Sequence, residues 1–186
     1  MKYAVCIATS VICLAACNKG PTVNVKNATG NQVAAAVKQS GVMTSDSMIE
    51  PGLWQSKVSI EEMNMPGVPP QYMDKMKQSM AEHRNDTNKH CVTEADVKKP
   101  KADFFGADKE CKYDHFTMGG GKIDLAMICH REDMTQNMKV SGSYTPTSYS
   151  VDTAMTGTGG REGGMSMKMH VDANRIGQCT GKDDEG

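Results

Sequence analysis

The feature that most constrains the fold is a run of three glycines set midway between two cysteines. Residues 111–117 and 123–129 flank Gly119-Gly120-Gly121, and a glycine-rich turn between two such segments favours a β-hairpin. With the turn centred on the middle glycine, Cys111 lies directly opposite Cys129. Opposed residues of antiparallel strands have Cα atoms ~4.5–5.5 Å apart, a separation that a disulfide accepts. The sequence therefore predicts an antiparallel hairpin closed by a Cys111–Cys129 bridge.

The same counting extends the sheet through two further turns, at residues 145–148 and 157–164. In the first hairpin the remaining expected pairs are Tyr113 with Met127, His115 with Leu125, and Thr117 with Ile123. Across the next turn they are Tyr144 with Tyr149, Val140 with Thr153, and Met138 with Met155. Across the last they are Met155 with Met165, Val151 with Met169, and Tyr149 with Val171. Each register places the apolar side chains on one face, as a one-sided antiparallel sheet requires, and His115 is expected on that core face.

A sixth strand and a helix are predicted upstream. Residues 54–61 alternate between apolar and polar after Pro51-Gly52, which is the period of a half-buried strand, and Trp54 is expected to fill the core. Residues 71–83 are expected to form a helix with one apolar stripe. That stripe consists of Met73, Met76 and Met80. We therefore predict a mainly β fold with minor α (α+β), in which one amphipathic helix packs on a curved antiparallel meander of about six strands.

Four of the seven cysteines remain for disulfides. Cys6 and Cys13 lie in an N-terminal apolar run, and Cys17 ends it. An even set of four in an oxidising compartment is typical of two disulfides. No two of them are spaced as Cys-x-x-Cys, so neither a zinc ribbon nor a thioredoxin-type centre is expected. With Cys111 joined to Cys129, Cys91 and Cys179 are left to form the second bridge.

The N-terminus is typical of a bacterial lipoprotein. Lys2 precedes residues 4–16, which are almost wholly apolar or small, a run too short to span a bilayer but suited to a signal peptide. It ends in Leu14-Ala15-Ala16-Cys17, which resembles the lipobox at which a signal is removed and the cysteine acylated. Two or more acyl chains anchor a protein stably. We expect lipid on Cys17; the alternative is an ordinary secretory signal cut after Ala16.

The chain is expected to have four parts. They are a lipoprotein signal peptide (1–16), a lipidated cysteine and flexible tether (17–50), a disulfide-bonded antiparallel β domain (51–179) and an acidic tail (180–186). The tether is polar and has no aromatic residue, and its one expected helix covers residues 31–40 and ends at Gly41. Asn18 in place of an aspartate favours the outer membrane over the inner one, so the expected location is the cell envelope, facing the periplasm. The 21 basic and 22 acidic side chains give no basic field for nucleic acid.

Several short motifs resemble a known family. They are Pro51-Gly52-Leu53-Trp54, the Met-Pro-rich residues 63–70, Cys91 before a Thr-x-x-Asp turn, and the ending Arg-Ile-Gly-Gln-Cys at 175–179. Together they are similar to the proteobacterial envelope family catalogued as domain of unknown function 3617, over about residues 50–179. The resemblance implies a small disulfide-bonded periplasmic or lipoprotein domain. It implies no activity, substrate or catalytic residue.

Binding, rather than catalysis, is the predicted function. The sequence has no Gly-x-Ser-x-Gly elbow, His-Glu-x-x-His, phosphate loop or dinucleotide fingerprint, so we expect no enzyme and no cofactor. Methionine is abundant, with 16 residues, and its adaptable side chain suits a face that takes an apolar ligand or an envelope protein partner. The residues expected to line that face are Trp54, Met73, Met76, Met80, Met127, Met155, Met165, Met167 and Met169.

Two alternatives to that function stay open. Thioethers select Cu(I), so Met165, Met167 and Met169 with His170 form an alternative metal site. Adjacent strand residues point to opposite faces, however, so His170 and Met169 need a bulge between them to reach one ion. The second alternative is a purely structural envelope protein, whose methionine-rich face is simply a filled core.

Overall fold

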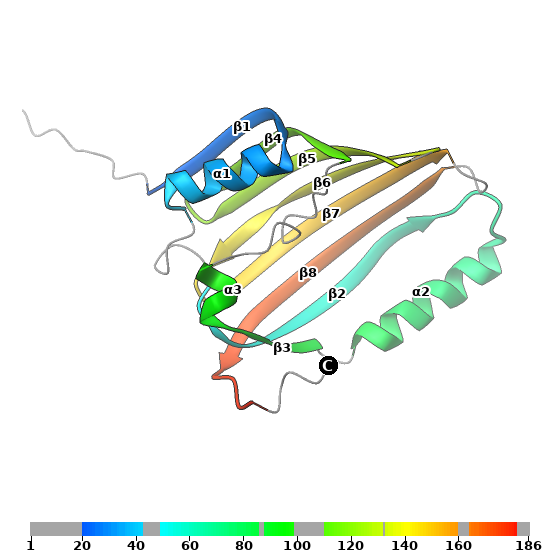
Figure 1. Cartoon of the computed structure of the whole chain (residues 1–186). Coiled ribbons are helices and arrows are strands. Elements are labelled where there is room, and N and C mark those ends of the chain that lie inside the picture. Colours follow the sequence, from blue (N-terminus) through cyan, green and yellow to red (C-terminus); the bar gives the residue numbers. More distant parts are fainter. Residues whose placement is uncertain are drawn as a thin grey trace, which may run out of the picture.

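A computed structural model describes residues 20–42, 49–85, 88–98, 110–131, 133–159 and 164–181. Its strands are β1 (Thr22–Thr29), β2 (Gly52–Asn64), β3 (Asn88–Val92), β4 (Cys111–Gly119), β5 (Lys122–Arg131), β6 (Met134–Thr145), β7 (Ser148–Gly159) and β8 (Met165–Gly177). Its helices are α1 (Gly30–Ser40), α2 (Pro70–Asn85) and α3 (Glu94–Lys98). Within these residues the strands form one antiparallel sheet of eight, in the order β1-β4-β5-β6-β7-β8-β2-β3 (Figure 1). The mainly β fold is thus confirmed, with β1 and β3 added at the two edges of the six predicted strands.

The registers of the three hairpins agree with the prediction to different degrees. Between β6 and β7 every predicted pair is confirmed, including Met138 with Met155. Between β7 and β8 the prediction is wrong by two residues, because Met155 lies opposite Met167 and not Met165. Val151 accordingly faces Val171, and Tyr149 faces Ala173. A shift of two residues keeps each side chain on its predicted face, because strand residues alternate in direction.

The β4–β5 hairpin contains a bulge that sequence reasoning missed. Cys111 pairs with Cys129 as predicted, and the two are joined by a disulfide with a Cα separation of 3.9 Å. Beyond Tyr113 the register shifts by one, so that Phe116 and not His115 lies opposite Leu125. Met118, likewise, takes the predicted place of Thr117 opposite Ile123. A one-residue shift exchanges the two faces, so the prediction that His115 lies on the core face is wrong.

The segment expected to be a flexible tether is largely an ordered part of the sheet. β1 pairs along β4 from Thr22 to Thr29, and α1 then folds back over the face of the sheet (Figure 1). The predicted short helix is therefore present. The side chain of Thr29 accepts the N–H of Gln32, and the side chain of Gln32 accepts the N–H of Thr29, forming a capping box. Gly41 ends the helix with φ 69°, in the left-handed conformation that glycine favours.

The tether prediction fails because a few small apolar residues, spaced among polar ones, are enough to dock the segment. Val33 and Val37 of α1 are 1% and 3% exposed, and Val23, Ala28 and Val42 are equally buried. They pack with Tyr113, Phe116, Leu125 and Met127 in one core cluster. The face of the sheet that this core occupies is called the inner face below.

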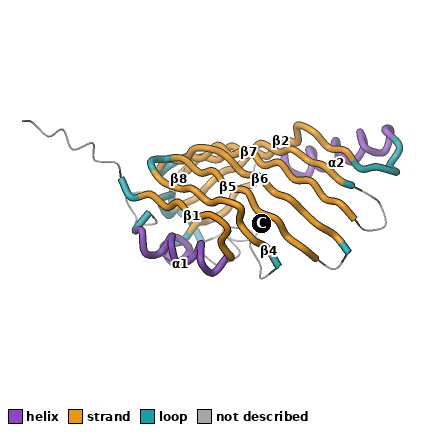
Figure 2. Tube along the Cα trace, turned by 90° about the horizontal axis from the view of Figure 1, so that it is seen from above, coloured by secondary structure: helices purple, strands orange, loops and turns teal. Residues whose placement is uncertain are grey.

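The methionine helix plays a smaller part than predicted. α2 confirms the expected helix, but it lies beside β2, at the end of the sheet opposite α1 (Figure 2). Met73 is buried, whereas Met76 is 38% exposed, and the side chain of Met80 lies outside what the structure describes. The prediction that a single helix packs on the sheet is thus corrected: α1, and not α2, covers the core cluster. Of the helices in the described ranges, none is long and apolar enough to cross a membrane.

Candidate functional site

A row of methionines crosses the inner face of the sheet. Met127, Met138, Met155, Met167 and Met63 lie on the adjacent strands β5, β6, β7, β8 and β2, each directly opposite the next. These five residues are called the methionine row below. Because directly opposed residues of antiparallel strands point to the same face, their side chains stand next to one another. Strands lie ~4.8 Å apart, so the row is ~19 Å long.

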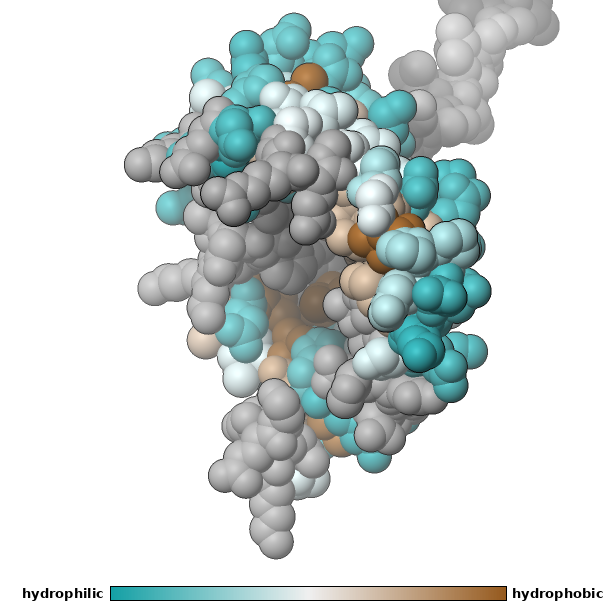
Figure 3. Space-filling model, turned by 90° about the vertical axis from the view of Figure 1, so that its right-hand side faces the viewer, coloured by the Kyte–Doolittle hydropathy of each residue, from teal (hydrophilic) through white to brown (hydrophobic). Residues whose placement is uncertain are grey.

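The methionine row begins in the core and continues onto a more open part of the face. Toward β1 it is prolonged by Tyr113 and Ala28, which are buried near α1. Met127 is 2% exposed, but the other four members are only partly buried. A view from the end of the sheet near α2 shows brown, apolar atoms recessed between teal, hydrophilic rims (Figure 3). Most of the thioethers are therefore both packed and accessible from solvent.

The rows on either side of the methionine row contain no charged side chain. One consists of Cys129, Gln136, Gly157 and Met165, and the other of Leu125, Val140, Thr153, Met169 and Ile60. The amide Nε2 of Gln136 donates a hydrogen bond to Sδ of Met155 over 3.7 Å. The surface is thus suited to neutral, apolar or soft groups and disfavours an unpaired charge.

The structure brings together only some of the predicted ligand-face residues. Met127, Met155 and Met167 belong to the methionine row, with Met165 and Met169 in the flanking rows. Trp54 does not. It lies nine residues from Met63 along β2, a distance of ~30 Å in a strand.

Trp54 is buried in the core, as predicted, at the end of β2 opposite to Met63. It is fully buried, its ring stacks on that of Tyr149 at a centroid distance of 5.8 Å, and its Nε1 donates to the carbonyl of Glu50 over 2.9 Å. The one polar atom of the indole ring is therefore satisfied by the backbone.

Sequence reasoning missed Met63 because a bulge hides it. Counting in twos from Trp54 places residue 63 on the outer face of the sheet. A register shift between Ile60 and Glu62 adds one residue to β2, so that Met63 returns to the inner face opposite Met167. The sequence pattern could have placed Met138 beside the ligand-face methionines, since its pairing with Met155 was predicted. Its place opposite Met127 follows from the β5–β6 register, which no turn motif specified.

The alternative copper site drawn from the sequence does not assemble. Met165, Met167 and Met169 share the inner face, but His170 lies on the outer face. There its Nδ1 lies 2.6 Å from Asp152, and its Nε2 lies 3.1 Å from Asp172. The imidazole is engaged on both sides and cannot join the thioethers.

The residues around His170 form an outer-face cluster that sequence reasoning missed. Oγ of Ser150 lies 3.3 Å from Nε2 of His170, so serine, imidazole and the Asp152 carboxylate follow one another as in a hydrolase triad. The period-two spacing Ser150-x-Asp152 opposite His170-x-Asp172 is the signal that could have revealed it. Hydrogen bonds to Asp152 and then Asp172 raise the pKa of His170, which favours the imidazolium. Nε2 of His170 lies 3.1 Å from the Asp172 carboxylate and 3.3 Å from Oγ of Ser150, so that carboxylate competes with the serine for the imidazole.

The side chains that most often bind metals are not grouped as a metal site in the described part of the chain. In the part of the chain that the structure describes, no three His, Cys, Asp or Glu side chains are placed to hold a metal ion together. His115 sits in a second outer-face cluster, with Nε2 2.6 Å from Asp124 and Nδ1 3.3 Å from Asp114. Both clusters hold a histidine between carboxylates, which gives the outer face of the sheet its polar character.

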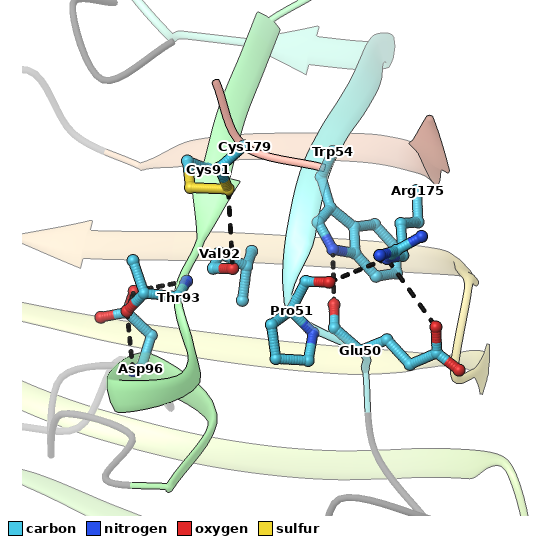
Figure 4. Close-up of a disulfide and its surroundings, with 9 residues drawn as sticks. All are labelled: Glu50, Pro51, Trp54, Cys91, Val92, Thr93, Asp96, Arg175 and Cys179. Carbon is cyan, nitrogen blue, oxygen red and sulfur yellow. Dashed lines mark hydrogen bonds and ion pairs between the residues drawn. A yellow bond between two sulfur atoms is a disulfide. The ribbon is translucent and has the colours of Figure 1, made fainter. Parts of the chain in front are cut away.

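Three of the four motifs that resembled a family meet at one corner of the sheet (Figure 4), whereas residues 63–70 begin at the other end of β2. Nε of Arg175 donates to the carbonyl of Pro51 over 2.8 Å and lies 3.8 Å from a carboxylate oxygen of Glu50. Gly52 has φ 150°, and a Cβ there would lie 2.5 Å from the carbonyl oxygen of Gly177. Glycine is thus required by both conformation and space.

The second disulfide closes the same corner. Cys91 of β3 is joined to Cys179, two residues after β8, with a Cα separation of 5.6 Å, as predicted. Thr93 follows and caps α3, because its side chain accepts the N–H of Asp96 while the Asp96 carboxylate accepts from the N–H of Thr93. The motif residues at this corner therefore have structural roles: Gly52 allows a close approach of two strands, Thr93 and Asp96 cap α3, and Cys91 and Cys179 form a covalent link.

Fold and site together define a small antiparallel β-sheet domain with disulfides at two places and a methionine-lined inner face. The chain belongs to the family described as Protein of unknown function (DUF3617), whose model matches residues 49–179. The match includes β2 to β8 and both disulfides, and it leaves out β1 and α1. No curated protein and no solved structure matches the chain.

Proposed function

We propose that this chain is a non-catalytic lipoprotein of the cell envelope that faces the periplasm and binds an apolar ligand along the methionine row. The observation that carries the proposal is the directly paired row of five thioether side chains on the inner face, of which Met138, Met155, Met167 and Met63 are partly exposed. A core that only had to be filled has no need for a continuous accessible line of flexible side chains. Such a line suits a ligand whose shape varies.

The chemistry of the surface selects a flexible hydrocarbon chain as the ligand. Neither the methionine row nor the rows beside it carry a charge, so a charged or strongly polar ligand would lose hydration without finding a partner. Burying about ten methylene groups contributes ~8 kcal/mol before the entropy of association is subtracted. A row ~19 Å long offers the contact length that such a chain needs.

The ordered β1 changes how the proposed lipid anchor holds the domain. Cys17, which lies outside the described residues, is only five residues before Thr22, the first residue of β1. A stretch of five residues spans at most ~17 Å. Acylation of Cys17 therefore keeps the sheet close to the membrane surface, where a tether of more than thirty residues would have let it move away.

The anchor is tested by membrane fractionation of Cys17→Ser. The variant should move from the membrane fraction to the soluble periplasmic fraction. Cys13→Ser is the matched control, because it changes a cysteine of the signal peptide without touching the acylated position, and it should remain with the membrane. Equal fractionation of the two variants would refute lipidation at Cys17.

The ligand site is tested on the Cys17→Ser protein purified from the periplasm, with a fluorescent fatty acid as the probe. The protein should bind the probe, and Met155→Lys, which places a charge in the middle of the row, should weaken binding at least tenfold. Met76→Lys on α2 is the control and should bind normally. Near-ultraviolet circular dichroism shows that each variant is folded. No binding by the unaltered row, or equal binding by folded Met155→Lys, would leave only a structural role or a protein partner.

A further inference from the structure

We propose that the methionine row is also a binding site for a soft monovalent metal ion, Cu(I) or Ag(I), centred on Met138, Met155 and Met167. Neutral thioethers bind soft cations and leave hard ones such as Mg²⁺ and Ca²⁺ to oxygen ligands. The inference goes beyond the apolar ligand proposed above and does not depend on it.

The cross-strand register supplies the geometry. Met155 lies directly opposite Met138 on one side and Met167 on the other. Opposed Cα atoms are ~4.5–5.5 Å apart, and each side chain has three rotatable bonds. The three sulfur atoms can therefore converge on one point above β7 without any movement of the backbone. A trigonal set of three thioethers results.

The surroundings favour a monovalent soft ion at this point. All three side chains are partly exposed, so an ion can enter from solvent. The flanking rows hold no amine or guanidinium that would repel a cation and no carboxylate that would attract a hard one. Sδ of Met155 accepts a hydrogen bond from Gln136, which occupies one of its lone pairs and orients the sulfur while leaving the other lone pair for the metal. Gln136 is thus a positioning residue for the middle ligand.

The register also explains why this triplet, and not the triplet along β8, is the site. Met165 lies opposite Gly157, and Met169 lies opposite Thr153. Neither has a thioether across from it on β7. Along one strand, residues on the same face are two apart, ~6.7 Å, which is farther than the distance between paired strands.

The test is a titration of the Cys17→Ser protein with Ag(I), a redox-stable analogue of Cu(I). When this protein is exported with an ordinary secretory signal that is cut before residue 17, its remaining cysteines are the four held in the disulfides Cys91–Cys179 and Cys111–Cys129, so no thiol competes for the metal. Native mass spectrometry should show one bound ion. Spectra of protein labelled with ¹³C at the methionine methyl groups should show shifts at Met138, Met155 and Met167.

Replacement by leucine separates the metal from the apolar ligand. The triple variant Met138→Leu, Met155→Leu, Met167→Leu keeps volume and hydrophobicity, so it should unfold within a few degrees of the parent and still bind the fatty-acid probe. It should lose Ag(I) binding, and Met155→Leu alone should weaken it at least tenfold. Met76→Leu is the matched control and should bind Ag(I) normally.

Three results would overturn the metal site: no bound ion in the parent protein, Ag(I) retained by the folded triple variant, or methyl shifts confined to other methionines. Each is independent of the probe experiment. An apolar site without a metal site gives probe binding and no Ag(I) in the parent, and a metal site without an apolar site gives the reverse.

Discussion

The sharpest test of the fold is the replacement of Val33 by alanine. Val33 lies in the segment whose composition predicted a flexible tether, yet it is 1% exposed and belongs to the core cluster. If α1 were detached, this side chain would be in water, and its truncation would leave stability unchanged. Because α1 is docked, Val33→Ala must lower the free energy of unfolding.

The magnitude follows from burial. The substitution removes the equivalent of two methylene groups, each contributing ~0.8 kcal/mol when buried, and the cavity left behind adds a further term. Alanine is the better helix former by ~0.5 kcal/mol, which offsets part of the loss. The net destabilisation of Val33→Ala is about 2 kcal/mol, equivalent to a fall in Tm of roughly 4–8 °C for a domain of this size.

The assay is thermal unfolding of the Cys17→Ser protein with and without Val33→Ala, followed by circular dichroism. Lys38→Ala is the control, since Lys38 lies on the exposed side of the same helix and its replacement removes no buried contact. A Tm for Val33→Ala equal to that of Lys38→Ala would show that α1 does not pack on the sheet, and the tether prediction would be restored.

Three other predictions follow from the site and the corner motifs. Replacing Cys91 and Cys179 by alanine opens an 88-residue loop and should lower the free energy of unfolding in urea by roughly 4–5 kcal/mol. An unchanged urea midpoint would contradict a stabilising disulfide between these two residues. In Asp152→Asn the pKa of His170 should fall toward its ordinary value, as measured by NMR titration. Because folding raises that pKa, the stabilisation is full below about pH 6.5 and is lost as the pH rises through the folded pKa, so the variant should lose stability chiefly at acidic pH. Gly52→Ala should be destabilising by about 1–3 kcal/mol, since φ 150° and the Gly177 carbonyl both exclude a Cβ; equal stability refutes this.

Much of the sheet could be predicted because its determinants are local. Alternation marks the strands, Gly120 and Gly121 mark a turn that needs positive φ at both residues, and the paired cysteines fix where that hairpin starts. The β6–β7 register is confirmed for the same reason: its tight turn at Pro146-Thr147 leaves one way to keep both apolar faces together.

Two of the failures share one physical cause, which is that one extra residue in a strand reverses its faces. The bulge after Tyr113 moved His115 outward, and the bulge after Ile60 moved Met63 inward. Bulges are stabilised by the side chains that pack on either side of them. They have no sequence signal comparable to the glycines and prolines that mark a turn. The outer cluster of His170 with Asp152 was missed because each strand shows only half of it, and its two halves are 18 residues apart.

The sequence by itself determined the class of fold, the disulfide pairing and the side of the sheet on which most methionines lie, because period, turn chemistry and cysteine spacing act over short distances along the chain. Only the tertiary structure decided that β1 and α1 complete the core, that β2 returns beside β8, and that five methionines align in one row. Those outcomes depend on registers between strands far apart in sequence, and each register is settled by the burial of side chains on both partners at once.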